Sequence, residues 1–186
     1  VWTGLAEHHM AFGGTVTLDY DAFAAVLRGV LRSAHRCGFR RAVLLNGHGG
    51  NAEAVAVAAT SVSTEFGMKV AAGTYWHLIG DAFAPILERQ SNVMHACEAE
   101  TSMMLALRPG SVRRERLEEA HGPASTRVEG QPPTLALRRS FRDVSPSGVV
   151  GVGKRIFSRS APIWKLKGTW PTATSTPLPP VRSAPS

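Results

Sequence analysis

A histidine set among glycines is the first feature of this sequence that could do chemistry. Residues 46–51 read Asn-Gly-His-Gly-Gly-Asn and directly follow the apolar run 42–45. Open α/β sheets bind ligands at the carboxyl ends of their strands, and glycines let the backbone approach a ligand or metal closely. The segment matches neither the GxGxxG nor the GxxxxGK[ST] nucleotide pattern. His48 is therefore a candidate functional residue, and the alternative is a turn whose glycines serve geometry alone.

A second candidate set lies at residues 95–102, which read His-Ala-Cys-Glu-Ala-Glu-Thr-Ser. We expect a helix over about 94–107, on which His95 and Glu98 share one face and suit a metal ligand paired with a proton carrier. On a regular helix Glu100 points roughly 160–200° away from Glu98, so the two carboxylates do not face one site. The alternative is structural, because the helix dipole favours acidic residues in a first turn.

The remaining histidines and aromatic residues give weaker signals. His8 and His9 are adjacent, so we expect their side chains to diverge rather than to chelate one ion. Trp76 follows a predicted strand and is a candidate pocket residue, although a lone aromatic residue there is more often part of a core. The chain contains no CxxC pair and no serine at a nucleophile elbow.

The elements that must hold these residues follow from the apolar pattern. Residues 22–37 place apolar side chains at spacings of three and four with arginines opposite, which predicts an amphipathic helix. Asp19 or Asp21 can cap its start, and Gly38 is a natural end. The sequence thus predicts a helix immediately before the apolar run that leads to His48.

A strand, a turn, a helix and a second strand follow in order. The apolar run 42–45 predicts a strand buried on both faces, as in a parallel sheet covered by helices. A helix over about 52–66 ends at Gly67, and a strand starts at 68–75. This order is a βαβ unit, for which a right-handed crossover is expected.

Charge divides the chain into two parts. The 186 residues carry a formal charge of +7, of which +6 comes from residues 144–186, a stretch with six basic residues and no acidic one. Residues 1–143 hold 15 basic and 14 acidic residues, so they give no electrostatic case for nucleic-acid binding. We expect an α/β domain over 1–152 and a basic, disordered tail rich in Pro, Ser and Thr over 153–186.

Composition also indicates a compartment. No apolar run approaches the ~18–20 residues that a membrane span needs. Cys37 and Cys97 are the only cysteines, too few for a disulfide framework, which favours a reducing compartment. We therefore expect a cytoplasmic protein with neither a membrane nor nucleic acid as its partner.

Three separated motifs together resemble one known family. They are His-Met-Ala-Phe-Gly-Gly-Thr at 9–15, Leu-Leu-Asn-Gly-His-Gly-Gly-Asn at 44–51, and the stretch 95–109 with its Glu-Thr-Ser triplet. Ser-Gly-Val-Val-Gly at 147–151 is similar to a glycine-rich turn near the family's C-terminus. On these motifs, in order and spacing, residues 4–151 resemble the creatininase (creatinine amidohydrolase) family.

The resemblance implies a three-layer α/β/α fold with a mostly parallel sheet, commonly assembled as a hexamer. It also implies two divalent metal ions (zinc, manganese or iron) and hydrolysis of a C–N bond by a metal-activated water. Such ions lower the pKa of water and polarise a carbonyl group. The expected partners are a small substrate, namely a cyclic amide, a formamide or a small peptide, and further copies of the chain.

The resemblance also implies roles for individual residues. His48 is similar to the family's metal-binding histidine, and Glu100 to a further metal ligand, with Glu98 as the alternative. His95 is similar to the residue that shuttles protons to the leaving nitrogen. The residues expected at the substrate, by the same resemblance, are Trp76, Gly49, Gly50 and His9.

The sequence departs from the family's pattern in two places. Family members carry a Glu-x-His-Gly segment and an aspartate before the first matched motif, and these supply most of the metal ligands. This sequence starts after that point, so we expect an N-terminally truncated member with an incomplete metal site. Creatininase itself has an aromatic and an acidic residue where this chain has Gly49 and Gly50, so creatinine is not the expected substrate.

Three alternatives to the general amidohydrolase stay open. A catalytically inactive relative could keep the fold and a structural or oligomerisation role without the metals. Mycofactocin-precursor peptidases share the Asn-Gly-His-Gly-Gly-Asn turn but lack an acid at the position of Glu98, which makes that activity less favoured. A nucleic-acid binder that uses the basic tail is the least favoured, because residues 1–143 are almost neutral.

Overall fold

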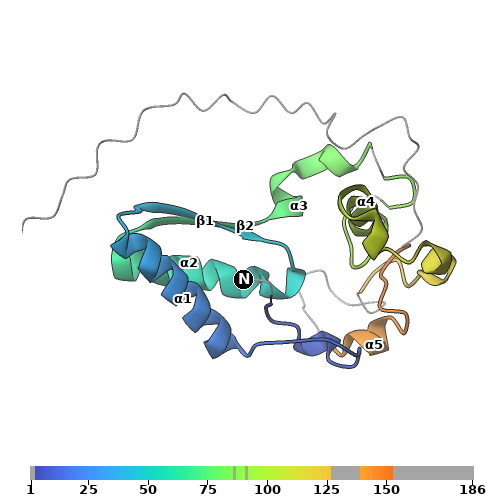
Figure 1. The fold of residues 1–186 in the computed structure, drawn as a ribbon, viewed down its shortest axis with the longest axis horizontal. Coiled ribbons are helices and arrows are strands. Elements are labelled where there is room, and N and C mark those ends of the chain that lie inside the picture. Colours follow the sequence, from blue (N-terminus) through green and yellow to red (C-terminus); the bar gives the residue numbers. More distant parts are fainter. Residues whose placement is uncertain (1–2, 86, 91, 127–138, 153–186) are drawn as a thin grey trace, which may run out of the picture.

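A short parallel sheet and two helices packed on it form the first half of the molecule (Figure 1). The computed structural model describes residues 3–85, 87–90, 92–126 and 139–152. Strand β1 (Arg41–Asn46) pairs in parallel with β2 (Lys69–Thr74), and helix α2 (Ala52–Phe66) connects them. The predicted βαβ unit and the α/β class are thereby confirmed.

Helix α1 (Tyr20–Arg36) precedes the sheet and has well-defined ends. Of the two predicted caps, Asp19 is the one used, because its Oδ1 accepts a hydrogen bond from the amide of Ala22 at 2.7 Å. Gly38, with a φ of 95°, turns the chain after the helix as predicted. A Cβ is disfavoured at that φ, which explains why glycine ends this segment.

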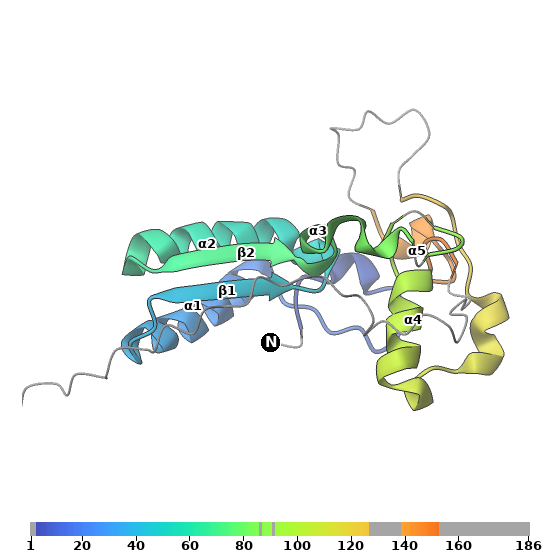
Figure 2. The ribbon, with the colours of Figure 1, turned by 90° about the horizontal axis from the view of Figure 1, so that it is seen from above.

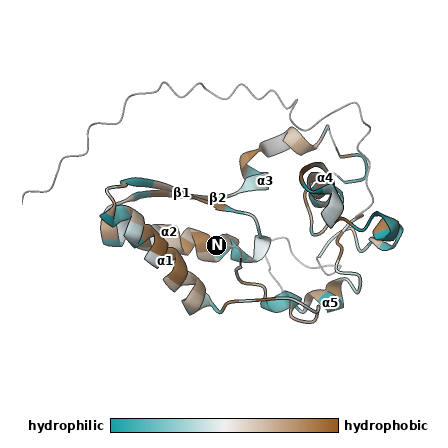
Figure 3. Cartoon of the chain, viewed as in Figure 1, coloured by the Kyte–Doolittle hydropathy of each residue, from teal (hydrophilic) through white to brown (hydrophobic). Residues whose placement is uncertain are grey.

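The core lies between the sheet and the two helices on a single face of it (Figures 1 and 3). Phe23 and Leu27 of α1 pack against Val55 of α2, and Leu44 of β1 contacts this cluster from the sheet. On the opposite face, Val43 and Leu45 of β1 are 70% and 66% exposed. The prediction that β1 is buried on both faces is therefore wrong for the described residues, because helices cover only one face.

The second half of the described chain lies beyond the carboxyl ends of the strands (Figure 2). It contains only short helical segments around one longer helix. Their bounds are α3 (Tyr75–Leu78), α4 (Glu98–Leu107) and α5 (Phe141–Val144), with 3₁₀ turns η3 (Gly80–Phe83), η4 (Pro109–Ser111) and η5 (Arg114–Glu119). A further 3₁₀ turn, η1 (Glu7–His9), lies near the start of the chain.

Helix α4 begins later than the sequence predicts. Ala96 has a φ of 48° and Cys97 is extended, so regular helix starts only at Glu98. His95 instead forms an antiparallel bridge with Val150. The expectation that His95 and Glu98 share a helix face is therefore wrong.

Two further expectations concern the ends of the chain and the membrane. The expected tail, residues 153–186, lies outside the described residues. Among the described residues, no helix is long and apolar enough to cross a membrane.

Candidate metal centre

A cavity of about 680 Å³ opens where the carboxyl ends of β1 and β2 face α4 and α5. Its position is the one expected for ligands of an α/β sheet. It collects side chains that are far apart in the sequence, including seven of the eight residues singled out above. Those seven are His9, His48, Gly49, Gly50, Trp76, His95 and Glu100.

The last residue of β1 fixes the loop that carries His48. The buried Asn46 side chain donates from Nδ2 to the carbonyl of His48 at 2.8 Å and to Thr74 Oγ1 at 3.0 Å. Its Oδ1 accepts from the amide of His48 at 3.1 Å. Farther along, Asn51 Oδ1 accepts from the amide of Leu5 at 2.8 Å and ties the N-terminal segment to this loop.

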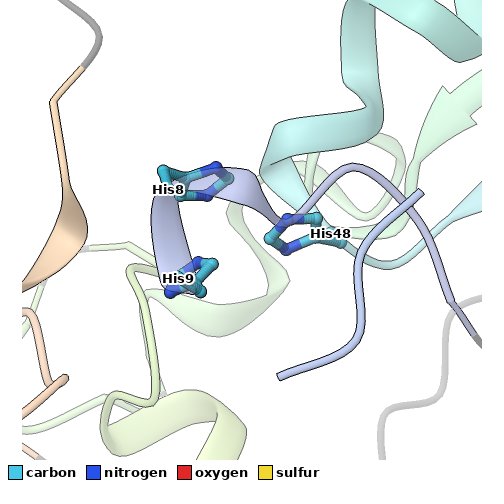
Figure 4. Close-up of side chains that lie close together, drawn as sticks. All are labelled: His8, His9 and His48. Carbon is cyan, nitrogen blue, oxygen red and sulfur yellow. The ribbon is translucent and has the colours of Figure 1, made fainter. Parts of the chain in front are cut away.

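Three histidines converge at the edge of this cavity (Figure 4). His8, His9 and His48 each offer a ring nitrogen, and these three atoms lie within 4.8 Å of one another. The prediction that His8 and His9 diverge is wrong. Both belong to the 3₁₀ turn η1, which brings their ring centroids to 4.1 Å, while the centroids of His8 and His48 are 5.5 Å apart.

Gly50 makes room for this cluster. A Cβ built at Gly50 would lie 2.6 Å from His48 Nε2, 2.6 Å from the carbonyl oxygen of Leu5 and 2.8 Å from His8 Cε1. Real Cβ atoms essentially never approach that closely. The glycine at position 50 therefore has a geometric cause in this chain, since any other residue there would push the imidazoles away.

The electrostatic setting keeps the His9 and His95 imidazoles neutral near pH 7. Burial, aided by the neighbouring histidines, lowers the pKa of His9 from 6.5 to about 4. Burial has the same effect on His95, whose pKa also falls to about 4. His9 Nε2 is buried without a hydrogen-bond partner among the described residues. Neutral imidazoles with an unsatisfied nitrogen suit a divalent metal, so the residues present fit such an ion.

The two glutamates of the second motif take different positions. Glu100 lines the cavity, its Oε2 accepts from the amide of Ala96 at 2.6 Å, and burial raises its pKa. Glu98 is 1% exposed and does not line that cavity. Its carboxylate accepts from the amides of Glu88 and Arg89 at 2.9 and 3.0 Å, which holds the preceding loop. Side chains two positions apart on a helix point in nearly opposite directions, which accounts for the different surroundings of Glu98 and Glu100.

An aromatic residue from α5 closes the cluster. The Phe141 ring centroid lies 4.5 Å from that of His9 and 4.5 Å from that of His95. The His9 and His95 rings are themselves stacked at 4.5 Å. Sequence reasoning did not select His8 or Phe141. The adjacent pair His8-His9 was a signal for the first, whereas nothing in the local sequence marks the second.

A family model and several curated proteins match this sequence. The model of the creatinine amidohydrolase family matches residues 1–156. The mycofactocin precursor peptide peptidase of Mycobacterium ulcerans is 32% identical over 164 residues, which are 83% of this chain and 58% of that protein. The 3-dehydro-scyllo-inosose hydrolase of Thermotoga maritima is 31% identical over 121 residues, 62% of this chain and 39% of that protein.

Solved structures give the same result. A creatinine amidohydrolase (creatininase) crystal structure superposes with a TM-score of 0.61 at 27% identity, covering 76% of this chain and 56% of that one. A mutant creatininase complexed with creatine gives a TM-score of 0.64 at 25% identity, covering 81% and 63%. The chain thus spans only about 58% of the length of the curated relatives such as the M. ulcerans peptidase. With the family model matching most of its residues, the chain belongs to the creatininase family.

Proposed function

We propose that this chain is a metal-dependent hydrolase that cleaves the C–N bond of a cyclic amide, a formamide or a small peptide with an activated water. The main support is the convergence of His48, His95 and Glu100 on one cavity at the carboxyl ends of the strands. A neutral imidazole and a carboxylate are ordinary ligands of zinc, manganese and iron, so His48 and Glu100 would hold the ion. When bound, the ion would lower the pKa of water and polarise the scissile carbonyl.

His95 is suited to move the proton. Its lowered pKa of about 4 leaves the imidazole neutral near pH 7, with a free lone pair for a proton from water. Once charged, the same ring can return that proton to the leaving nitrogen. Phe141 and His9 pack against the ring and would hold it in place during both transfers.

The size and walls of the cavity support a small substrate. A volume of about 680 Å³ falls within the roughly 300–1,000 Å³ typical of small-molecule sites. Trp76 supplies a flat aromatic wall, and the missing side chain at Gly49 leaves space beside it. The names of the relatives support amide chemistry, since one is a peptide peptidase and another a creatinine amidohydrolase.

A test of this function combines metal analysis with a substrate panel. The full 186-residue chain is loaded with zinc or manganese and incubated with cyclic amides, formamides and short peptides, and products are identified by mass spectrometry. His95→Ala should lower kcat by about 10²–10⁴-fold, the usual contribution of a positioned acid–base group, and leave the metal content unchanged. His77→Ala is the control, because His77 is exposed and does not line the cavity.

The same experiment addresses the inactive alternative. Metal at background level together with no hydrolysis of any substrate class would overturn the proposed function and support a structural role. The proposal also includes a cytoplasmic location and a homo-oligomer, a hexamer by family resemblance. Light scattering on the purified chain measures the mass of the assembly and hence the number of copies.

A further inference from the structure

We propose that His8, His9 and His48 form a three-nitrogen site for a transition-metal ion, with zinc the best match, and that the fourth coordination position faces the cavity. The ion would serve the same cavity as the proposed hydrolase, and the inference rests on that function only for its catalytic use. It adds two metal ligands: His9, which the family resemblance places at the substrate rather than at a metal, and His8, to which the resemblance gives no role.

The separation of the nitrogens is close to what a tetrahedral ion requires. Nitrogens bound to zinc at 2.0–2.1 Å in a tetrahedron lie about 3.3 Å apart. The three ring nitrogens already lie within 4.8 Å of one another. All three side chains are only partly buried, so an ion can reach them from solvent.

Surrounding groups fix the orientation of the rings. His48 Nε2 lies 3.1 Å from the carbonyl oxygen of Leu5, so the tautomer with a proton on Nε2 donates to that carbonyl and leaves Nδ1 with its lone pair. Histidine ligands commonly donate their second ring N–H to a carbonyl or carboxylate in this way. Gly50 leaves the space in which His8 and His48 approach each other.

The donor set predicts the class of metal. Three imidazoles without a carboxylate favour zinc, copper, nickel or iron over magnesium and calcium, which prefer oxygen ligands. Three protein ligands and one open position are also the arrangement of catalytic rather than structural zinc sites. Neutral ligands leave the full charge of the ion at the mouth of the cavity, where it would act on a bound water.

The experiment measures metal affinity directly on the full 186-residue chain. Zinc is titrated calorimetrically, and cobalt(II) serves as a spectroscopic probe whose visible absorption reports tetrahedral nitrogen coordination. His8→Ala, His9→Ala and His48→Ala should each weaken zinc binding by more than the roughly 10–100-fold that loss of an outer-shell partner costs. His35→Ala is the matched control, since His35 stacks on Phe66 and does not line the cavity.

Glycine variants provide a second, independent readout. Gly50→Ala should weaken zinc binding because its Cβ would collide with His8 and His48, whereas Gly47→Ala places its Cβ in open space and should not. Far-ultraviolet circular dichroism checks that every variant is folded. A histidine variant that unfolds as alanine is replaced by the corresponding asparagine variant.

The outcomes separate this site from the proposed function. Zinc binding that depends on His48 and Glu100, but not on His8 and His9, would overturn the three-histidine site and leave the hydrolase proposal intact. Zinc binding through all three histidines without hydrolysis of any substrate class would support the site and overturn the hydrolase proposal. Absence of zinc and cobalt binding would overturn the three-histidine site, and absence of manganese and iron binding as well would overturn the hydrolase proposal.

Discussion

Glu98 and Glu100 are the same type of residue two positions apart, and the fold gives them different surroundings. Glu98 receives hydrogen bonds from two backbone amides and is almost fully buried, which is typical of a carboxylate that holds a loop. Glu100 lies in the cavity wall, and burial raises its pKa, as is often found for carboxylates at functional sites. Of the two, Glu100 is therefore the one that we propose as a metal ligand.

Glutamine substitution at each position tests this division of roles. Glu98→Gln replaces one acceptor oxygen with a donor amide opposite two N–H groups, so the free energy of unfolding should fall by about 1–3 kcal/mol. Glu100→Gln should lower the metal content at saturation without a loss of stability, because burial already disfavours its charge. Urea unfolding measures the free energy of unfolding of each variant, and elemental analysis measures its metal content. Loss of metal in Glu98→Gln at unchanged stability would instead make Glu98 the ligand.

At the scale of elements, local sequence patterns were sufficient to predict a helix or strand wherever neighbouring residues determine its structure. The apolar spacing of α1, its Asp19 cap and the strand–turn–helix order around His48 were all predictable, because each depends on neighbouring residues. The start of α4 was not, since His95 forms a bridge with Val150, 55 residues farther along the chain, and the next residue, Ala96, has a positive φ. The convergence of His8 and His9 likewise depends on the packing of η1 against His48 and α5.

The start of α1 offers a prediction at this scale. Asp19→Ala removes the side-chain oxygen that accepts from the amide of Ala22, so the free energy of unfolding should fall by about 1 kcal/mol. Asp21→Ala is the matched control, because Asp21 lies in the first turn without being the cap and should cost less. Urea denaturation followed by circular dichroism measures both. Equal effects of the two substitutions would mean that the carboxylates act only through the helix dipole.

At the scale of the whole molecule, the cavity depends on chain segments that no local pattern connects. The turn η1, the loop after β1, the residues before α4 and the helix α5 each supply one wall. Contact between α5 and η1 joins positions more than 130 residues apart in the sequence. Metal affinity should therefore respond to packing changes that leave every ligand in place.

Phe141 is the residue with which to test that coupling. It is 8% exposed, and its ring packs against His9 and His95 at centroid distances of 4.5 Å. Phe141→Ala leaves a cavity beside both rings and should lower the free energy of unfolding by about 3–5 kcal/mol. Zinc binding should weaken as well, because the His9 ring loses the surface that holds its orientation.

Phe141→Leu is the control, since it keeps most of the apolar volume and should have smaller effects on both quantities. Urea denaturation gives the stability, and calorimetric zinc titration of the folded protein gives the affinity. If Phe141→Ala leaves the free energy of unfolding unchanged, α5 does not pack on η1 in solution. If stability falls while zinc affinity stays constant, the histidines hold their geometry without Phe141, and the site is organised by η1 and the loop after β1 alone.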